Sequence, residues 1–229
     1  MSDFFRFPHT PHLAWLGAAT PREDKLLPTG ELSSLLEQEF VVEEKIDGAN
    51  LGISTDEAGE LRVQNRGSWL SPDTCHPQFR SLWSWLGPKR SDLENALGSN
   101  LMLFGEWCVA VHTVEYNALP DWFLGFDVFE RSSGRFWSTI RRDALLNKLG
   151  LRHVPLLGRG IFGVDELRAL MDTSRVGSSA MEGVYVRAES SMWLRSRAKL
   201  VRPEFAQGID THWSHGTMHR NCLSPTVWN

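Results

Sequence analysis

Short apolar and alternating stretches along the chain predict β-strands separated by turns. An apolar run at 40–42 leads into the first sheet. We expect the Pro-rich start, residues 8–30, to wrap the surface before that sheet. Further strands are expected at 51–54, 61–65, 101–108, 122–130, 135–140, 182–188 and 192–202.

Helical segments separate these strands. Residues 91–97 are typical of a helix with Ser91 as its N-cap, and residues 141–149 of a helix closed by Gly150 at the C′ position. Antiparallel strands interleaved with helices predict an α+β fold. Because no Pro/Gly/Ser linker precedes a second set of strands, we expect a single domain. The remaining helices are expected at 78–86, 165–172 and near 204–213.

Charge and aromatic content limit the classes of partner. The chain has 229 residues and a net charge of −4, which argues against indiscriminate adhesion to nucleic acid but permits a local basic groove. Most of its ten tryptophans and twelve phenylalanines are expected in the core, with some rings able to stack on nucleobases. One basic stretch could grip nucleic acid, although a solvated helix face is the favoured interpretation. Its members are Arg131, Arg135, Arg141, Arg142, Lys148 and Arg152.

Cysteine usage and hydropathy bear on the compartment. Three widely spaced cysteines without a C-x-x-C pair argue against a structural zinc site and favour a reducing setting. The first residues contain no long apolar stretch of the kind found in secretory signals. No segment has the apolar length needed to span a membrane. We therefore expect a cytoplasmic protein.

The hexapeptide Lys45-Ile46-Asp47-Gly48-Ala49-Asn50 is the most informative segment. Its lysine follows an apolar run and precedes an Asp-Gly turn, so the amine is held at the mouth of a sheet. A fixed amine in such a place can attack a phosphorus or carbonyl centre. The alternative interpretation is an ordinary β-turn flanked by a solvated lysine.

Four later segments favour the reactive interpretation. Glu106 ends an apolar strand, Phe126-Asp127 lies within the next, Glu182 opens a third, and Lys199 lies near the end of a fourth. Each alone is a weak signal, since a strand-end carboxylate or a core phenylalanine explains it equally well. Their order along the chain makes the four segments a stronger signal together than any one of them alone.

In this order the segments resemble the motif set of the covalent nucleotidyltransferases, which include polynucleotide ligases and messenger-RNA capping enzymes. The form Glu44-Lys45-Ile46-Asp47-Gly48-Ala49-Asn50, with Arg66 and Phe126, looks most like the RNA ligase 2 family. The resemblance spans residues 40–205. It implies an ATP-grasp-like nucleotidyltransferase domain of antiparallel sheets flanked by helices, with ATP as AMP donor and Mg²⁺ or Mn²⁺ as metal.

The resemblance also implies a role for the lysine and its neighbours. Lys45 would attack the α-phosphate of ATP and form a lysyl-AMP phosphoramidate. A free lysine has a pKa of about 10.4, so we expect nearby cations, namely a metal, Lys199 and an arginine, to favour the neutral amine. Glu182 is the candidate metal ligand, since Mg²⁺ prefers carboxylate oxygens.

Other positions would bind the nucleotide. By resemblance, Glu106 would hold the ribose hydroxyl, Phe126 would stack on adenine, and Arg66 would touch the sugar or phosphate. Glu44 is the candidate for recognising adenine, with the adjacent Glu43 as an open alternative. The two remaining candidates, Asp47 and Asn50, would shape the pocket and assist sealing.

The chain departs from the family pattern near its end. The family's last motif carries two basic residues, of which Lys199 is the first, while Arg197 and Arg202 are lesser candidates for the second. We expect residues 206–229 to form a short C-terminal helix and tail, too short for an appended OB-fold. The expectation is a minimal catalytic core, with a possible accessory protein for grip on the substrate.

Together these features predict an ATP-dependent RNA ligase for RNA repair. It would adenylate a 5′-phosphate end and join that end to a 3′-hydroxyl, acting on RNA ends or a nicked duplex. The alternatives are an ATP-dependent DNA-nick ligase, a GTP-dependent capping guanylyltransferase and a non-catalytic nucleic-acid-binding module.

Overall fold

The computed structural model describes residues 4–17, 26–207 and 218–225. Within these residues the strands form two sheets, with orders β10-β9-β1-β8 and β3-β2-β4-β5-β6, and β7 pairs in parallel with β5. The four-stranded sheet contains β1 (Phe40–Lys45), β8 (Leu156–Gly160), β9 (Gly183–Glu189) and β10 (Leu194–Val201). The six-stranded sheet contains β2 (Ala49–Thr55), β3 (Leu61–Gln64), β4 (Leu101–Trp107), β5 (Phe123–Glu130), β6 (Arg135–Phe136) and β7 (Arg152–His153).

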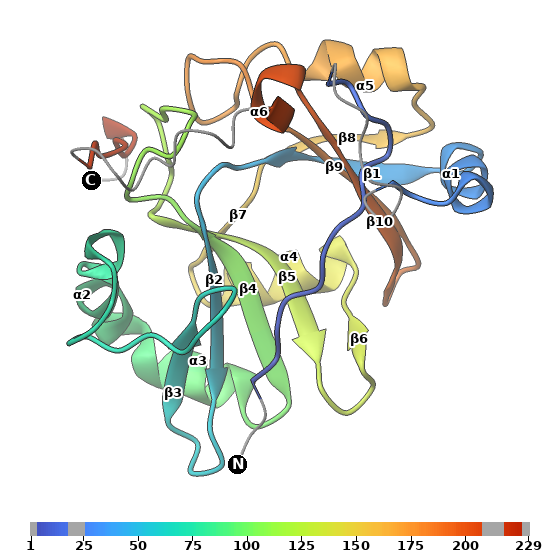
Figure 1. Ribbon diagram of the computed structural model, residues 1–229. Helices are drawn as coiled ribbons and strands as arrows, with labels where there is room; N and C mark the ends of the chain where they lie inside the picture. Colours follow the sequence, from blue (N-terminus) through green and yellow to red (C-terminus); the bar gives the residue numbers. More distant parts are fainter. Residues whose placement is uncertain (1–3, 18–25, 208–217, 226–229) are drawn as a thin grey trace.

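Helices cover the outer face of each sheet (Figure 1). Leu35 and Leu167, from two of these helices, join the apolar core on the outer face of the four-stranded sheet. Leu82 and Leu93 do the same for the six-stranded sheet. The helices are α1 (Thr29–Leu36), η2 (Pro77–Phe79), α2 (Leu82–Leu86), η3 (Gly87–Lys89), α3 (Arg90–Leu97), α4 (Thr139–Lys148), α5 (Val164–Leu170) and α6 (Pro203–Gln207).

The two-residue alternation of strands decides which side chains meet between the sheets. On β1, Phe40 and Val42 join the outer core, so Lys45 and Glu43 face inward. On β2, Leu51 and Ile53 face outward, so the side chain of Asn50 lies between the sheets. β1 runs directly into β2, and the chain therefore changes sheets just after Lys45 (Figure 1).

The α+β fold with antiparallel sheets flanked by helices is confirmed, and most predicted strands are present. Some details were wrong. The predicted N-cap Ser91 lies inside α3, which follows directly on η3 and has no side-chain cap. The strand predicted at 135–140 ends early, because the Ser138 hydroxyl accepts from the Arg141 N–H and begins α4. The predicted elements did not include α1, β7 or β8.

The Pro-rich start was expected to wrap the surface, but part of its described residues, 8–17 and 26–30, is buried. Phe7, His12 and Leu13 are buried. The backbone N–H of Leu13 donates to the carbonyl of Lys199 at 2.7 Å, and the N–H of Lys199 donates to the carbonyl of Pro11 at 2.9 Å. This segment therefore lies along β10 and packs against the space between the sheets.

Two further expectations concern the C-terminal part and hydropathy. The helix predicted near 204–213 corresponds to α6 up to Gln207, and residues 208–213 lie outside the described residues. Within the described part of the chain, no helix is both long and apolar enough to cross a membrane.

Candidate active site

A cavity of about 270 Å³ lies between the inner faces of the two sheets. Six predicted site residues line it, and five of them lie on strands of the two sheets, where strand alternation turns them toward each other. These six are Lys45, Asn50, Arg66, Glu106, Phe126 and Lys199. The cavity is completed by Phe7, Pro8, Thr10, Gly48 and Tyr185.

Lys45 stands at the end of β1 and its ammonium group forms an ion pair with Glu182. The register places Lys45 opposite Gly183, so the carboxylate next to that glycine lies within reach. Burial opposes the charge of Lys45, but the carboxylates around it outweigh burial and raise the pKa of Lys45 above its usual value, with Glu182 contributing most. The protein's own groups around Lys45 therefore favour its charged form, and the effect expected of a bound metal stays a prediction.

Glu106 and Asn50 form a directly opposed pair on β4 and β2. Glu106 Oε2 and Asn50 Oδ1 are both buried and have no hydrogen-bond partner among the described residues. Burial raises the pKa of Glu106 to about 8, with Glu182 adding to the effect and Lys45 opposing it. A buried acceptor without a partner costs about 1–3 kcal/mol. These two oxygens therefore fit a ligand that donates hydrogen bonds, such as a ribose.

Aromatic rings and a basic rim complete the cavity. Phe126 and Tyr185 line it from opposite sheets, and Phe7 packs edge-on against Phe126 with ring centroids 5.3 Å apart. Arg66 is exposed at the rim, on a turn that Asn65 holds by accepting from the backbone N–H groups of residues 67 and 68. Flat apolar walls with a cation at the mouth fit a purine nucleotide.

Asp47 does not line the cavity. Its carboxylate accepts hydrogen bonds from the backbone N–H groups of Thr113 and Val114, at 2.7 and 2.9 Å. Its own N–H donates to the hydroxyl of Tyr116 at 2.8 Å. Asp47 therefore fixes the turn between Lys45 and β2, which agrees with a pocket-shaping role and gives it no direct contact with the cavity.

The structure does not bring Glu44, a candidate for binding the nucleotide, to the cavity. Its side chain lies on the outer face of β1, one residue out of phase with Lys45, and is completely buried. It accepts hydrogen bonds from the Ser174 hydroxyl at 2.5 Å and the Arg175 N–H at 2.8 Å. The open alternative, Glu43, does face inward, but there the Arg142 guanidinium donates to it at 2.5 Å.

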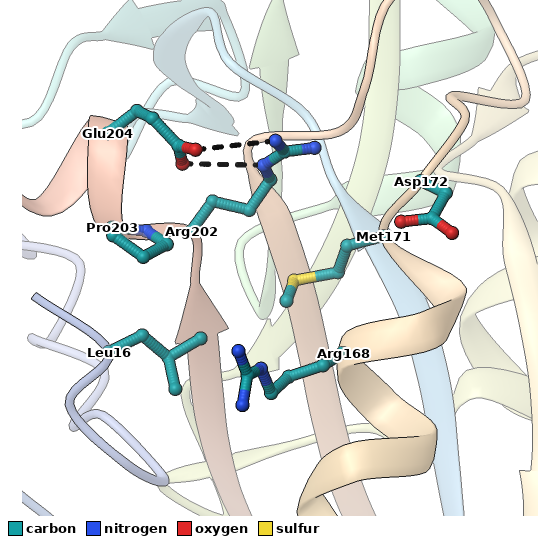
Figure 2. Close-up of a pocket in the computed structure, with 7 residues that line it drawn as sticks. All are labelled: Leu16, Arg168, Met171, Asp172, Arg202, Pro203 and Glu204. Atoms are coloured by element: carbon teal, nitrogen blue, oxygen red, sulfur yellow. Dashed lines mark hydrogen bonds and ion pairs between the residues drawn. The ribbon is translucent and has the colours of Figure 1, made fainter.

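The second basic residue of the last motif is not settled in favour of either candidate. Arg197 forms an ion pair with Asp127 and lines a small cavity beside the main one. Arg202 follows the end of β10, pairs with Glu204 at 3.4 Å and lines a different pocket, so its contact with the nucleotide stays a prediction. Figure 2 shows Arg202 with Glu204 in a separate pocket. Of these three basic candidates, only Lys199 lines the main cavity.

Sequence reasoning missed four lining residues, since the fifth, Gly48, lies within the hexapeptide that begins at Lys45. Tyr185 was detectable, because it lies opposite Lys199 in the register and shares the inward parity of Arg187 on β9. Phe7, Pro8 and Thr10 carried no such signal, since only tertiary packing brings them to the cavity.

A divalent cation would find two carboxylates near Lys45, namely Glu182, which pairs with it, and Glu106, which lines the cavity. Within residues 4–17, 26–207 and 218–225, no group of three or more His, Cys, Asp or Glu side chains could hold a metal. Mg²⁺ is commonly held by one or two carboxylates together with waters and substrate phosphates. Glu182 thus fits a metal that is bound jointly with a nucleotide.

Comparisons with known proteins agree with this geometry. No curated protein matches the chain. Three similar solved structures are of Naegleria gruberi RNA ligase. A variant with ATP and manganese is 16% identical over 86% of this chain and 56% of that one, with a TM-score of 0.63. The ligase with pyrophosphate is 17% identical over 90% of this chain and 61% of that one, with a TM-score of 0.59. A variant with AMP and manganese is 16% identical over 88% of this chain and 57% of that one, with a TM-score of 0.61.

At these identities the likeness shows a shared fold, and this chain spans about three fifths of the length of the solved ligases. The family is shown by a different comparison. The RNA ligase family model matches residues 38–201, which include both sheets and every inward residue from Lys45 to Lys199. The chain with this lysine-lined cavity therefore belongs to the RNA ligase family.

Proposed function

We propose that this protein is an ATP-dependent RNA ligase that works through a lysyl-AMP intermediate. The observation that supports it most is the convergence of Lys45, Glu106 and Lys199 on one cavity. Family membership and the fold shared with an ATP-bound ligase structure agree with it. The free thiols of Cys75, Cys108 and Cys222 are consistent with a reducing, cytoplasmic setting.

In the first step Lys45 Nζ attacks the α-phosphorus of ATP. A P–N bond forms, the bond to the β-phosphate oxygen breaks, and pyrophosphate leaves. Since an ammonium group has no lone pair, Lys45 must lose its proton before attack. Mg²⁺ or Mn²⁺ on Glu182 and the phosphates would supply positive charge that favours the neutral amine. Lys199 adds a fixed cation for the phosphate charge.

The nucleotide is positioned by the cavity walls. Glu106 accepts the ribose hydroxyl, with Asn50 beside it as a second acceptor. Phe126 packs on adenine, and Arg66 at the rim contacts the sugar or phosphate. This placement sets Nζ in line with the scissile bond, and positioning of that kind provides much of the rate in phosphoryl transfer.

Two further displacements complete the reaction. A 5′-phosphate oxygen of RNA attacks the phosphorus of lysyl-AMP, the P–N bond breaks, and AMP becomes linked to the RNA end through a diphosphate. A 3′-hydroxyl then attacks the 5′-phosphate, forms the phosphodiester and expels AMP. Asp47 keeps the turn after Lys45 in place throughout.

The first test is the intact mass of the purified protein after incubation with ATP and Mg²⁺ or Mn²⁺. The parent should gain the mass of one AMP and Lys45→Ala should gain none. Lys148→Ala, which removes an exposed lysine from α4, should behave as the parent does. Labelling by GTP in place of ATP would favour a capping enzyme, and labelling that persists in Lys45→Ala would contradict the proposal.

The substrate follows from sealing assays. Nicked duplexes that carry RNA or DNA at the 3′-hydroxyl side differ in the 2′-hydroxyl, which a protein can contact. An RNA ligase should seal the RNA version faster, and faster sealing of DNA would favour a DNA-nick ligase. AMP gain without sealing would point to a required accessory protein.

A further inference from the structure

Two surface segments, 131–142 and 190–202, lie side by side at one end of the molecule. The Ser138 N–H donates to the carbonyl of Met192 at 3.1 Å, and the Ser138 hydroxyl donates to that of Ser191 at 2.8 Å. In Figure 1 this places β6 beside the turn that joins β9 and β10. The segments present a set of side chains that we name the arginine–tryptophan strip: Arg135, Trp137, Arg141, Trp193 and Arg195.

The planar groups of this strip are already stacked. The Arg135 guanidinium lies over the Trp193 ring at 4.7 Å. Arg141 lies over Trp137 at 3.9 Å and over Trp193 at 4.7 Å. The Trp137 indole N–H donates to Glu130 at 2.8 Å, which fixes that ring. Flat cationic and aromatic groups held in place offer stacking surfaces at low entropic cost.

The charge around the strip is strongly positive. Neither 131–142 nor 190–202 contains an acidic residue, although the chain as a whole has a net charge of −4. Two nearby acids are already engaged: Glu130 binds Arg141 and Trp137, and Glu189 accepts from the Thr139 hydroxyl. Burial excludes Arg142 from the basic surface, because this residue is 1% exposed and paired with Glu43. An anionic partner therefore meets no exposed acid within these two segments.

The strip continues into the lysine cavity. Trp193, which directly precedes β10, and Lys199 within it are six residues apart, about 20 Å at ~3.3 Å per residue. Between them, Arg197 lies over the Phe136 ring at 4.5 Å and over the Phe7 ring at 4.6 Å, and Phe7 lines the cavity. A bound strand could therefore run from the strip to the reactive lysine without crossing an acidic surface.

We propose that the arginine–tryptophan strip binds the single-stranded RNA adjoining the reactive end. Bases stack on exposed ring and guanidinium faces, and phosphates pair with Arg135 and Arg195, both exposed. Stacking of this kind tolerates any base and is worth about 1–3 kcal/mol for each base. The inference rests on the proposed function, since it assigns a strand to that enzyme.

The test measures binding of a single-stranded RNA of about ten nucleotides, without ATP, as a function of salt. Trp193→Leu should weaken binding about tenfold, within the range expected for one lost stacking contact. The double variant Arg135→Gln/Arg195→Gln should lower the slope of log K against log salt by about 1.4, at ~0.7 for each cation on a single strand. Arg90→Gln removes a half-exposed arginine on α3 and should leave both the RNA affinity and the salt slope unchanged.

AMP transfer from ATP is measured on the same variants and should match the parent, which shows that the fold and cavity are intact. Unchanged RNA affinity and salt slope in the strip variants would overturn the inference, as would an equal loss in Arg90→Gln or a parent that does not bind RNA. A parent that binds RNA through the strip but gains no AMP would count against the proposed function alone.

Discussion

At the residue scale, the cavity holds carboxyl groups whose protonation differs from that in water. Glu106 shows this most clearly, because burial raises its pKa to about 8. A neutral carboxyl at physiological pH can donate as well as accept a hydrogen bond, so Glu106 can bind either a donor or an acceptor group. Its neighbour Lys45 is shifted in the direction that keeps its charge, so the two buried groups respond differently to pH.

The raised pKa of Glu106 predicts a pH-dependent stability. The folded state binds this proton more tightly than the unfolded chain, so its stabilising effect is present below about pH 4 and is lost as pH rises through 8. Glu106→Gln should flatten the decline of unfolding free energy between pH 5 and 8, by up to about 1.4 kcal/mol per pH unit. Denaturant unfolding across that range measures it.

A matched control for this prediction is Glu39→Gln, which changes an exposed glutamate in the turn before β1 and should leave the slope as in the parent. A Glu106→Gln variant with the parent's full slope would contradict the prediction.

At the element scale, the two faces of β1 place neighbouring charged side chains in different surroundings. On β1, Glu43 and Lys45 face the other sheet, while Glu44 between them points to Ser174 on the outer side. Being next to Lys45 in sequence therefore does not give a residue a place in the cavity, because a shift of one position along a strand puts the side chain on the opposite face of the sheet.

This parity predicts that Glu44→Gln alters stability and not nucleotide binding. Removing the charge weakens two buried hydrogen bonds and should cost about 1–3 kcal/mol in unfolding free energy. The ATP concentration for half-maximal AMP transfer should stay within about twofold of the parent. A large rise in that concentration with unchanged stability would show that Glu44 contacts the nucleotide.

Strand alternation also explains which residues of the cavity could be predicted from the sequence and which could not. Lys45 was predictable because an apolar run and an Asp-Gly turn frame it, and the family pattern then indicated Glu106 and Lys199. Glu44 was chosen because it is next to the lysine, without regard to strand alternation, and the structure places it on the opposite face of β1. Phe7 was missed because it contacts Phe126, which is far away in sequence, and the residues around Phe7 do not indicate such a contact.

At the scale of the whole molecule, buried ion pairs join the two sheets beside the cavity. Asp127 on β5 accepts from Arg187 on β9 at 2.5 Å and also pairs with Arg197 on β10. Glu43 on β1 pairs with Arg142 on α4, which also donates to the carbonyl of residue 126 at 2.8 Å. These contacts connect the strand that carries Lys45 with the strand that carries Phe126.

Asp127→Asn should therefore destabilise the protein strongly. The change keeps the shape but leaves Arg187 and Arg197 without their shared counter-charge, and breaking a buried pair in this way costs about 3–5 kcal/mol. Equilibrium unfolding in denaturant measures the loss. Glu60→Gln disrupts the exposed pair with Arg90 and should change stability by less than about 1 kcal/mol. Equal effects of the two changes would contradict the role of the buried network.

The placement of residues 7–13 affects which part of the chain is needed to form the complete cavity. The family match begins at residue 38, yet Phe7, Pro8 and Thr10 form part of the cavity wall, and the backbone of residues 11–13 is bonded to that of Lys199. A protein trimmed to the matched region would keep every motif while lacking one side of the cavity. The region matched by sequence similarity is therefore shorter than the part of the chain that encloses the cavity.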